Sequence, residues 1–201
     1  MKIAALVVFL ISFNQCFVGA LTAQPAMNVQ GAWESRAAEN TSTMICSEKY
    51  FSVAVYDKQN KKFISTHGGS YRVEDAEWIA TIEFHSSNPE LVGTEMRQRI
   101  ILNEDILTFD EKPKKVHWKQ LDAGGPGELA GAWLITGRAR DGQISKMTPG
   151  ARRTMKILSG TRFQWIAYNV ETKQFSGTGG GSYTTREGKY TENIEFFSRD
   201  N

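Results

Sequence analysis

Apolar and aromatic side chains alternate with polar ones in short runs along most of the chain, and polar turns separate the runs. Phe51, Val53 and Val55 alternate with smaller or more polar neighbours, and the run 163–168 follows the same rule. A period of two with aromatic and β-branched residues predicts strands, because successive side chains point to opposite faces. No helix of ordinary length is predicted, so the chain is expected to be all-β. Further strands are expected at 63–66, 78–84, 95–102, 106–109 and 116–121.

The strand pattern repeats. Residues 51–84 align without a gap on residues 163–196, at a constant offset of 112 and with twelve identities in thirty-four positions. The tripeptide Gly-Ala-Trp at 31–33 recurs at 131–133, and Thr-Met at 43–44 recurs at 154–155. Repeats of this kind indicate that one folding unit occurs twice.

Glycines interrupt both copies at the same place. Gly68 and Gly69, like the three glycines at 179–181, stand inside a strand pattern and lead into another strand. Glycines there predict a sharp bend or a bulge. A phosphate-binding loop would lead into a helix instead, so these glycines are interpreted as structural.

The repeat divides the chain into modules. Residues 29–121 supply about nine short strands, the pattern of a closed antiparallel barrel, and 122–128 form a glycine-rich linker. Residues 129–201 stop before the equivalents of the last three strands of the first copy. The second module is therefore expected to be an open half-barrel, to borrow strands, or to be part of a longer sequence. An open sheet edge predicts self-association, because unpaired edges invite other strands.

The first residues are expected to be a targeting segment. Residues 1–23 combine Lys2, an apolar run at 3–13 and small residues near position 20, which predicts a cleaved signal peptide; an uncleaved membrane anchor is the alternative. The mature chain is expected to be secreted or periplasmic, without an integral membrane segment. It retains Cys46 as its lone cysteine and so forms no internal disulfide.

Several motifs of the second copy together resemble a known family. They are Phe-Gln-Trp-Ile-Ala-Tyr at 163–168, Gly-Gly-Gly-Ser-Tyr at 179–183, Tyr-Thr-Glu-Asn-Ile-Glu-Phe at 190–196 and the opening Gly-Ala-Trp. The chain resembles a lipocalin-like family of secreted bacterial proteins of unknown function, over most of 129–201 and more weakly over 31–121. The resemblance implies small up-and-down barrels with a cavity and no established catalytic residues. The expected architecture is two tandem lipocalin-like antiparallel barrel modules, the first complete and the second lacking its last strands.

The charge distribution and the histidines indicate neither a nucleic-acid partner nor a catalytic or metal site. The formal net charge is +2 over 201 residues, and the basic residues form only short clusters, so no nucleic-acid partner is expected. His67, His85 and His117 would have to converge with an acid or a nucleophile to form a zinc site or a triad. They are interpreted as surface or edge residues. No catalytic residue, metal or cofactor is predicted, and the protein is expected not to be an enzyme.

Two glutamates occupy the same place in each copy. Glu83 and Glu195 both lie in an Ile-Glu-Phe strand. Either the carboxylate faces solvent while its apolar neighbours face the core, or it points inward toward an arginine such as Arg97 or Arg99, where pairing would offset the cost of desolvation.

Aromatic residues of both copies either fill the cores or line a cavity, since an eight-stranded barrel is just wide enough for side chains or one small ligand. The expected function is a non-enzymatic binding module for a small, largely apolar ligand; a structural protein that associates through open sheet edges is the alternative. The candidate ligand-binding residues are Trp33, Phe51, Tyr56, Tyr71, Glu83, Arg97, Arg99, Trp133, Phe163, Trp165, Tyr168, Tyr183 and Glu195.

Overall fold

The computed structural model describes residues 27–110, 115–125 and 127–199. In these residues every regular element is a strand, apart from one 3-10 turn, η1 (Pro89–Leu91). The all-β expectation is confirmed. The expected signal peptide, residues 1–23, lies outside the described residues. No helix in the described part of the chain has the length and apolar character needed to cross a membrane.

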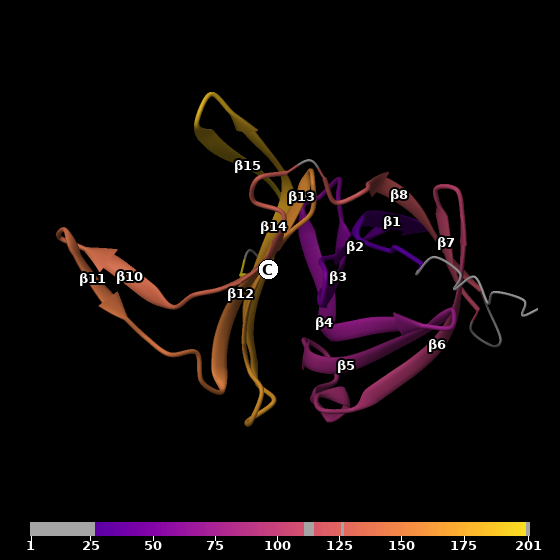
Figure 1. Cartoon of the computed structure of the whole chain (residues 1–201), viewed down its shortest axis with the longest axis horizontal. Coiled ribbons are helices and arrows are strands. Elements are labelled where there is room, and N and C mark those ends of the chain that lie inside the picture. Colours follow the sequence, from indigo (N-terminus) through magenta and orange to yellow (C-terminus); the bar gives the residue numbers. More distant parts are fainter. Residues whose placement is uncertain (1–26, 111–114, 126, 200–201) are drawn as a thin grey trace, which may run out of the picture.

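Within the described residues, eight strands form a closed antiparallel barrel (Figure 1). Each strand pairs with the next along the chain, and β8 pairs with β1 to close the ring. The sequence predicted about nine strands for this unit, so the count is one lower. The strands are β1 (Gly31–Ala37), β2 (Asn40–Cys46), β3 (Tyr50–Asp57), β4 (Lys62–Glu74), β5 (Glu77–His85), β6 (Glu95–Asn103), β7 (Ile106–Phe109) and β8 (Val116–Asp122).

The barrel interior holds one apolar core. Trp33 is fully buried in it, and its indole Nε1 donates a hydrogen bond to the Val29 carbonyl at 2.9 Å. Alternate residues of every strand contribute to this core, as the period of two requires. Other members include Met44, Phe51, Val53, Trp78, Ile82, Ile100, Leu107, Phe109 and Trp118.

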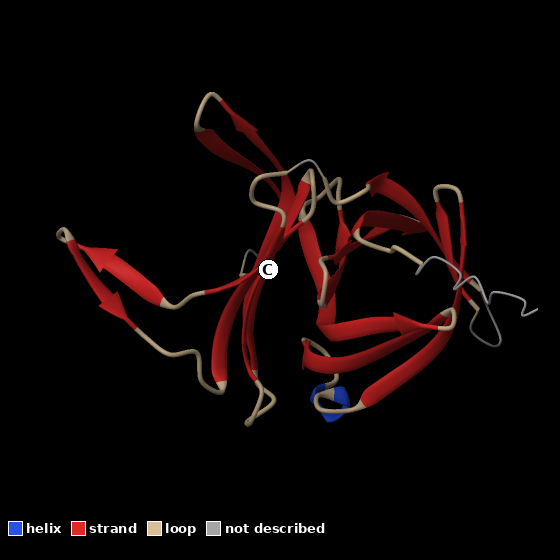
Figure 2. Cartoon of the chain, viewed as in Figure 1, coloured by secondary structure: helices blue, strands red, loops and turns tan. Residues whose placement is uncertain are grey.

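The remaining strands form an open antiparallel part beside the barrel, in the order β15-β14-β13-β12-β9. A separate hairpin, β10–β11, stands away from it (Figures 1 and 2). The hairpin lies where the sequence predicted only a loop, at 139–152. The bounds are β9 (Gly131–Leu134), β10 (Gly137–Arg140), β11 (Gln143–Lys146), β12 (Arg152–Leu158), β13 (Arg162–Asn169), β14 (Phe175–Arg186) and β15 (Lys189–Phe197).

One face of this open sheet packs on the outer wall of the barrel. Ile45 and Phe84 of the barrel share a buried cluster with Ile157, Ile166 and Tyr168 of the sheet. A second cluster joins Ala54, Tyr56 and Phe63 to Phe196. Burial of apolar area at about 25 cal/mol per Å² is the main force that holds the two parts together.

Glycine bulges occur where the sequence predicted them. The β4–β5 register shifts between Gly68 and Gly69, and the β14–β15 register shifts between Gly180 and Gly181. A Cβ on Gly69 would lie 2.0 Å from the Thr81 carbonyl oxygen, so only glycine fits. A bulge interrupts the alternation of side chains, and this decides where the neighbouring glutamates point.

The strand register corrects one sequence match. In the barrel, Met44 lies between Val53 and Trp33 across the strands, whereas in the open sheet Lys156 lies between Trp165 and Trp133. Lys156, and not the preceding methionine, therefore occupies the place that Met44 holds in the barrel. The Thr-Met match at 43–44 and 154–155 is out of register by one residue.

Replacing Gly69 by alanine tests the bulge. Because the new methyl group meets backbone rather than a flexible side chain, we expect Gly69→Ala to lower the free energy of unfolding by about 1–3 kcal/mol. Gly150→Ala is the matched control, since a Cβ there meets nothing within 4 Å. Urea unfolding measures both variants, and equal stability of the two would contradict this explanation of the bulge.

Candidate ligand-binding cavity

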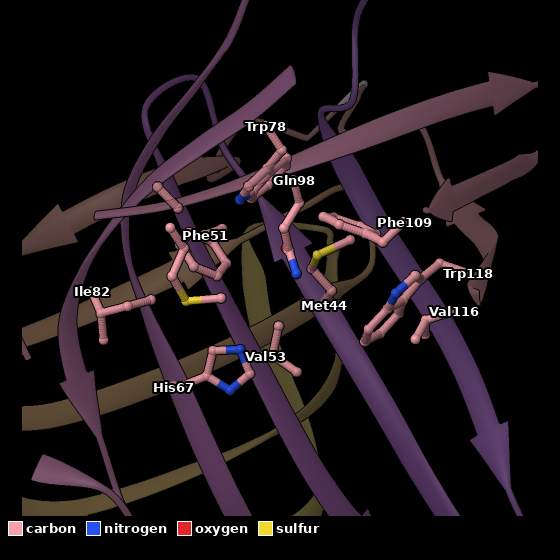
Figure 3. Close-up of a pocket in the computed structure, with 12 residues that line it drawn as sticks. Met44, Phe51, Val53, His67, Trp78, Ile82, Gln98, Phe109, Val116 and Trp118 are labelled. Atoms are coloured by element: carbon pink, nitrogen blue, oxygen red, sulfur yellow. The ribbon is translucent and has the colours of Figure 1, made fainter. Parts of the chain in front are cut away.

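A cavity of about 160 Å³ lies inside the closed barrel. Figure 3 shows its labelled side chains pointing into a shared space, with few polar atoms among them. The side chains come from β2 to β8, so the cavity exists only because the barrel is closed. Its lining consists of Met44, Phe51, Val53, His67, Trp78, Ala80, Ile82, Met96, Gln98, Phe109, Val116 and Trp118.

Aromatic contacts fix one wall of the cavity. Trp78 stacks on Tyr71 with ring centroids 4.2 Å apart, and it meets Phe51 edge-on at 5.2 Å and Phe109 at 5.5 Å. The Tyr71 hydroxyl donates to the Ser47 carbonyl at 2.6 Å. Edge-to-face and offset ring pairs are favourable beyond the area that they bury. This wall is therefore held in one arrangement.

His67 and Gln98 are the polar members of the lining. Burial, with a smaller contribution from nearby His85, lowers the pKa of His67 from 6.5 to about 4. The two imidazoles stack with centroids 5.4 Å apart. His85 Nδ1 accepts hydrogen bonds from the backbone N–H groups of Ser87 and Asn88. At neutral pH His67 is uncharged, so it presents one donor and one acceptor nitrogen.

The size and polarity of the cavity suit a small apolar molecule. Apolar protein cavities of about 150 Å³ stay dry and take up benzene or xenon. Water enters such a space only where it finds two or more polar partners. A concave space with a largely apolar lining and two polar side chains is the usual composition of a ligand site.

The barrel residues predicted to bind ligand divide into three groups. Phe51 lines the cavity, while Trp33 and Tyr71 lie in the same core around it. Tyr56 and Glu83 lie on the outer wall, against the open sheet. Arg97 and Arg99 are exposed on β6, and Arg97 pairs with Glu77 and Glu95 at the surface.

The two glutamates take a position that neither sequence interpretation gave. Glu83 accepts hydrogen bonds from Tyr168 at 2.9 Å and Arg153 at 2.7 Å, across the contact between barrel and sheet. The bulge beside Gly69 turns Glu83 and Phe84 to the same outer side, while Ile82 faces the cavity.

Glu195 makes the reciprocal contact. It accepts hydrogen bonds from Tyr56 at 2.7 Å and Arg162 at 2.9 Å, and Lys58 lies 3.1 Å away. Burial by itself would raise the pKa of Glu195, but the Tyr56 hydroxyl and the positive charges of Arg162 and Lys58 outweigh burial and lower it. Each part of the chain thus supplies one tyrosine and one glutamate to the other.

The other predicted residues belong to the open sheet. Tyr168 lies in the contact with the barrel, as described. Phe163 and Tyr183 pack together with Leu158, and Trp133 is exposed. Trp165 is partly buried against this cluster. None of these residues lines the barrel cavity.

Of the twelve residues that line the cavity, only Phe51 is among the candidates predicted from the sequence. Trp78, Met96, Phe109 and Trp118 line the cavity from β5 to β8. Most of these strands lie outside the repeated stretches 51–84 and 163–196, which contain most of the predicted candidates. Their alternation with polar neighbours within the predicted strands was the available signal.

The architecture gives the structural class of the protein. It is an eight-stranded antiparallel barrel, compatible with a lipocalin-like fold, to which an open sheet is attached. Comparison with protein families, with curated protein sequences and with solved structures found no match. In the described residues no three His, Cys, Asp or Glu side chains gather in a way that would hold a metal ion.

The buried imidazole predicts a dependence of stability on pH. Because the pKa of His67 falls from 6.5 in the unfolded chain to about 4, the unfolded state binds more protons between these values. Stability is therefore complete above pH 6.5 and falls as the pH drops toward 4. We expect His67→Gln to reduce this loss of unfolding free energy on acidification by about 1–2 kcal/mol. The expected effect is smaller than the complete change in pKa implies, because the imidazole is partly accessible to solvent.

Urea unfolding at about pH 7.5 and about pH 5 measures the effect. His117→Gln is the control, because His117 is exposed on the same barrel. A His67 variant that loses as much stability on acidification as the His117 variant would show that His67 is not the group responsible.

Proposed function

We propose that the barrel is a non-enzymatic binding module for a small, largely apolar ligand, held in the cavity of about 160 Å³. One observation carries the proposal: the barrel is closed, yet its side chains leave an apolar space unfilled. Protein cores are normally packed as densely as organic crystals. An unfilled cavity lowers the stability of the fold. A ligand-binding function would explain why the barrel keeps one.

The cavity also favours a size and a chemistry for the ligand. A volume near that of the cavities which take up benzene suits a ligand of about six to ten non-hydrogen atoms. The rings of Trp78, Phe109 and Trp118 favour an aromatic or short branched skeleton. The neutral imidazole of His67 offers a hydrogen bond to one hydroxyl or N–H group of such a ligand.

We further propose that the open sheet is a second copy of the same lipocalin-like module. The bulges recur at the offset of 112, and so does a side-chain contact: Tyr71 donates to Ser47 and Tyr183 donates to Ser159, both at 2.6 Å. The offset that relates the sequences thus relates these contacts as well. Export of the protein is part of the proposal and rests on the sequence of residues 1–23.

Filling the cavity tests its function. We expect the native protein to bind toluene in a saturable way, followed by the fluorescence of the cavity tryptophans. Ala80→Leu places an isobutyl group in the cavity, because Ala80 is buried in its wall, and should weaken binding about tenfold or more. Ala139→Leu on the exposed hairpin should leave binding unchanged. A native protein that takes up no toluene, or an Ala80 variant that binds as well as the native protein, would rule the proposal out.

A second candidate function is association through strand edges. In the part of the chain that the structure describes, β9 pairs on one side only, and β15 meets β4 at a single pair, Phe197 with Lys62. Unpaired edges are templates for another strand. Light scattering during size-exclusion chromatography discriminates this candidate: a mass that rises with concentration supports it, and a monomer at high concentration excludes it.

A further inference from the structure

The open sheet has a second face, which points away from the barrel. Across its strands Trp133 lies opposite Lys156, and Lys156 lies opposite Trp165. Direct cross-strand neighbours place their side chains on the same side of a sheet, about 4.5–5.5 Å apart. A lysine therefore stands between two indoles. We call this surface, with Tyr190 and Glu192 of β15, the distal face.

A charged pair lies on the distal face among aromatic rings. Lys156 forms a salt bridge with Glu192, and its ammonium group lies 5.0 Å from the ring centre of Phe163 and 4.8 Å from that of Tyr190. In a dry barrel interior an ion pair would cost several kcal/mol of desolvation. The distal face therefore suits a ligand with polar groups.

The same register positions are apolar in the barrel. Met44 holds the place of Lys156, and Ala80 holds the place of Glu192 at the offset of 112; both line the barrel cavity. The barrel interior and the distal face therefore differ in polarity at these two positions. A ligand that suits one face does not suit the other.

The aromatic surface of the distal face is accessible. Trp133 is 54% exposed and Tyr190 is 38% exposed. Gly179 leaves room for Trp165, since a Cβ there would lie 2.8 Å from the indole Nε1. Large aromatic side chains exposed together, beside polar groups, mark binding surfaces more often than isolated ones do.

We propose that the distal face binds a neutral sugar ring. The indole and phenol faces take the apolar C–H side of a pyranose, because aromatic side chains combine a flat apolar body with polar tips. Glu192 accepts a hydrogen bond from one hydroxyl, and Lys156 donates to its neighbour; hydrogen bonds to charged groups are the stronger kind. A charged ligand gains less, since Lys156 and Glu192 pair with each other and present no net charge to attract it.

Cellohexaose and maltohexaose, titrated separately into the full chain by NMR or calorimetry, test the proposal. We expect at least one to bind with a dissociation constant of about 0.1–1 mM. Trp133→Ala and Glu192→Gln should each weaken binding about tenfold, whereas Ile144→Ala, a control on the hairpin with a side chain 72% exposed, should not.

Three results would overturn the proposal: no binding of either oligosaccharide at about 10 mM, unchanged binding by the Trp133 variant, or a dimer of the native chain that Trp133→Ala dissociates. The last result would assign the distal face to a second copy. Toluene uptake is the folding check, because Trp133 and Glu192 do not line the barrel cavity. Failure of sugar binding and failure of the cavity are thus separate outcomes.

Discussion

The pairing of β8 with β1 is the constraint on which the rest of the structure depends. Once eight strands close, each side chain faces either the interior or the outer wall, and the interior is just wide enough for side chains or one small ligand. Small residues such as Ala80 then leave space for the cavity, and rings such as Trp78 form its walls. The same closure presents a continuous outer wall, on which the open sheet packs.

The contact between barrel and sheet joins matching side chains from the two parts of the chain. Tyr56 bonds to Glu195 and Tyr168 bonds to Glu83, so the contact is reciprocal at the offset of 112. Between these pairs, Gln164 donates to Thr66 at 2.8 Å and to Thr178 at 2.9 Å. Ser52 stands at the position equivalent to Gln164, and among the described residues its hydroxyl is the buried side-chain polar atom without a hydrogen-bond partner. One amide thus serves both threonines at the centre of the contact.

Alternation and glycine placement were sufficient to predict most of the strands, the bulges and the closed barrel. They did not predict the direction of Glu83, because a bulge breaks the alternation on which such assignments rest. The hairpin β10–β11 was missed because its residues are exposed on both faces and carry no alternation. The cavity lies beyond sequence reasoning, since it depends on how rings from distant strands such as Trp78 and Phe109 pack.

The central claim is that the barrel interior leaves a largely apolar space open to a ligand and is not a filled core. Crystallography of the native protein under xenon pressure tests it most directly, because xenon enters apolar cavities of this size and scatters strongly. The account predicts a xenon atom bounded by Trp78, Ile82 and Phe109. A barrel without xenon, whose side chains close the space or whose cavity holds ordered water, would contradict it.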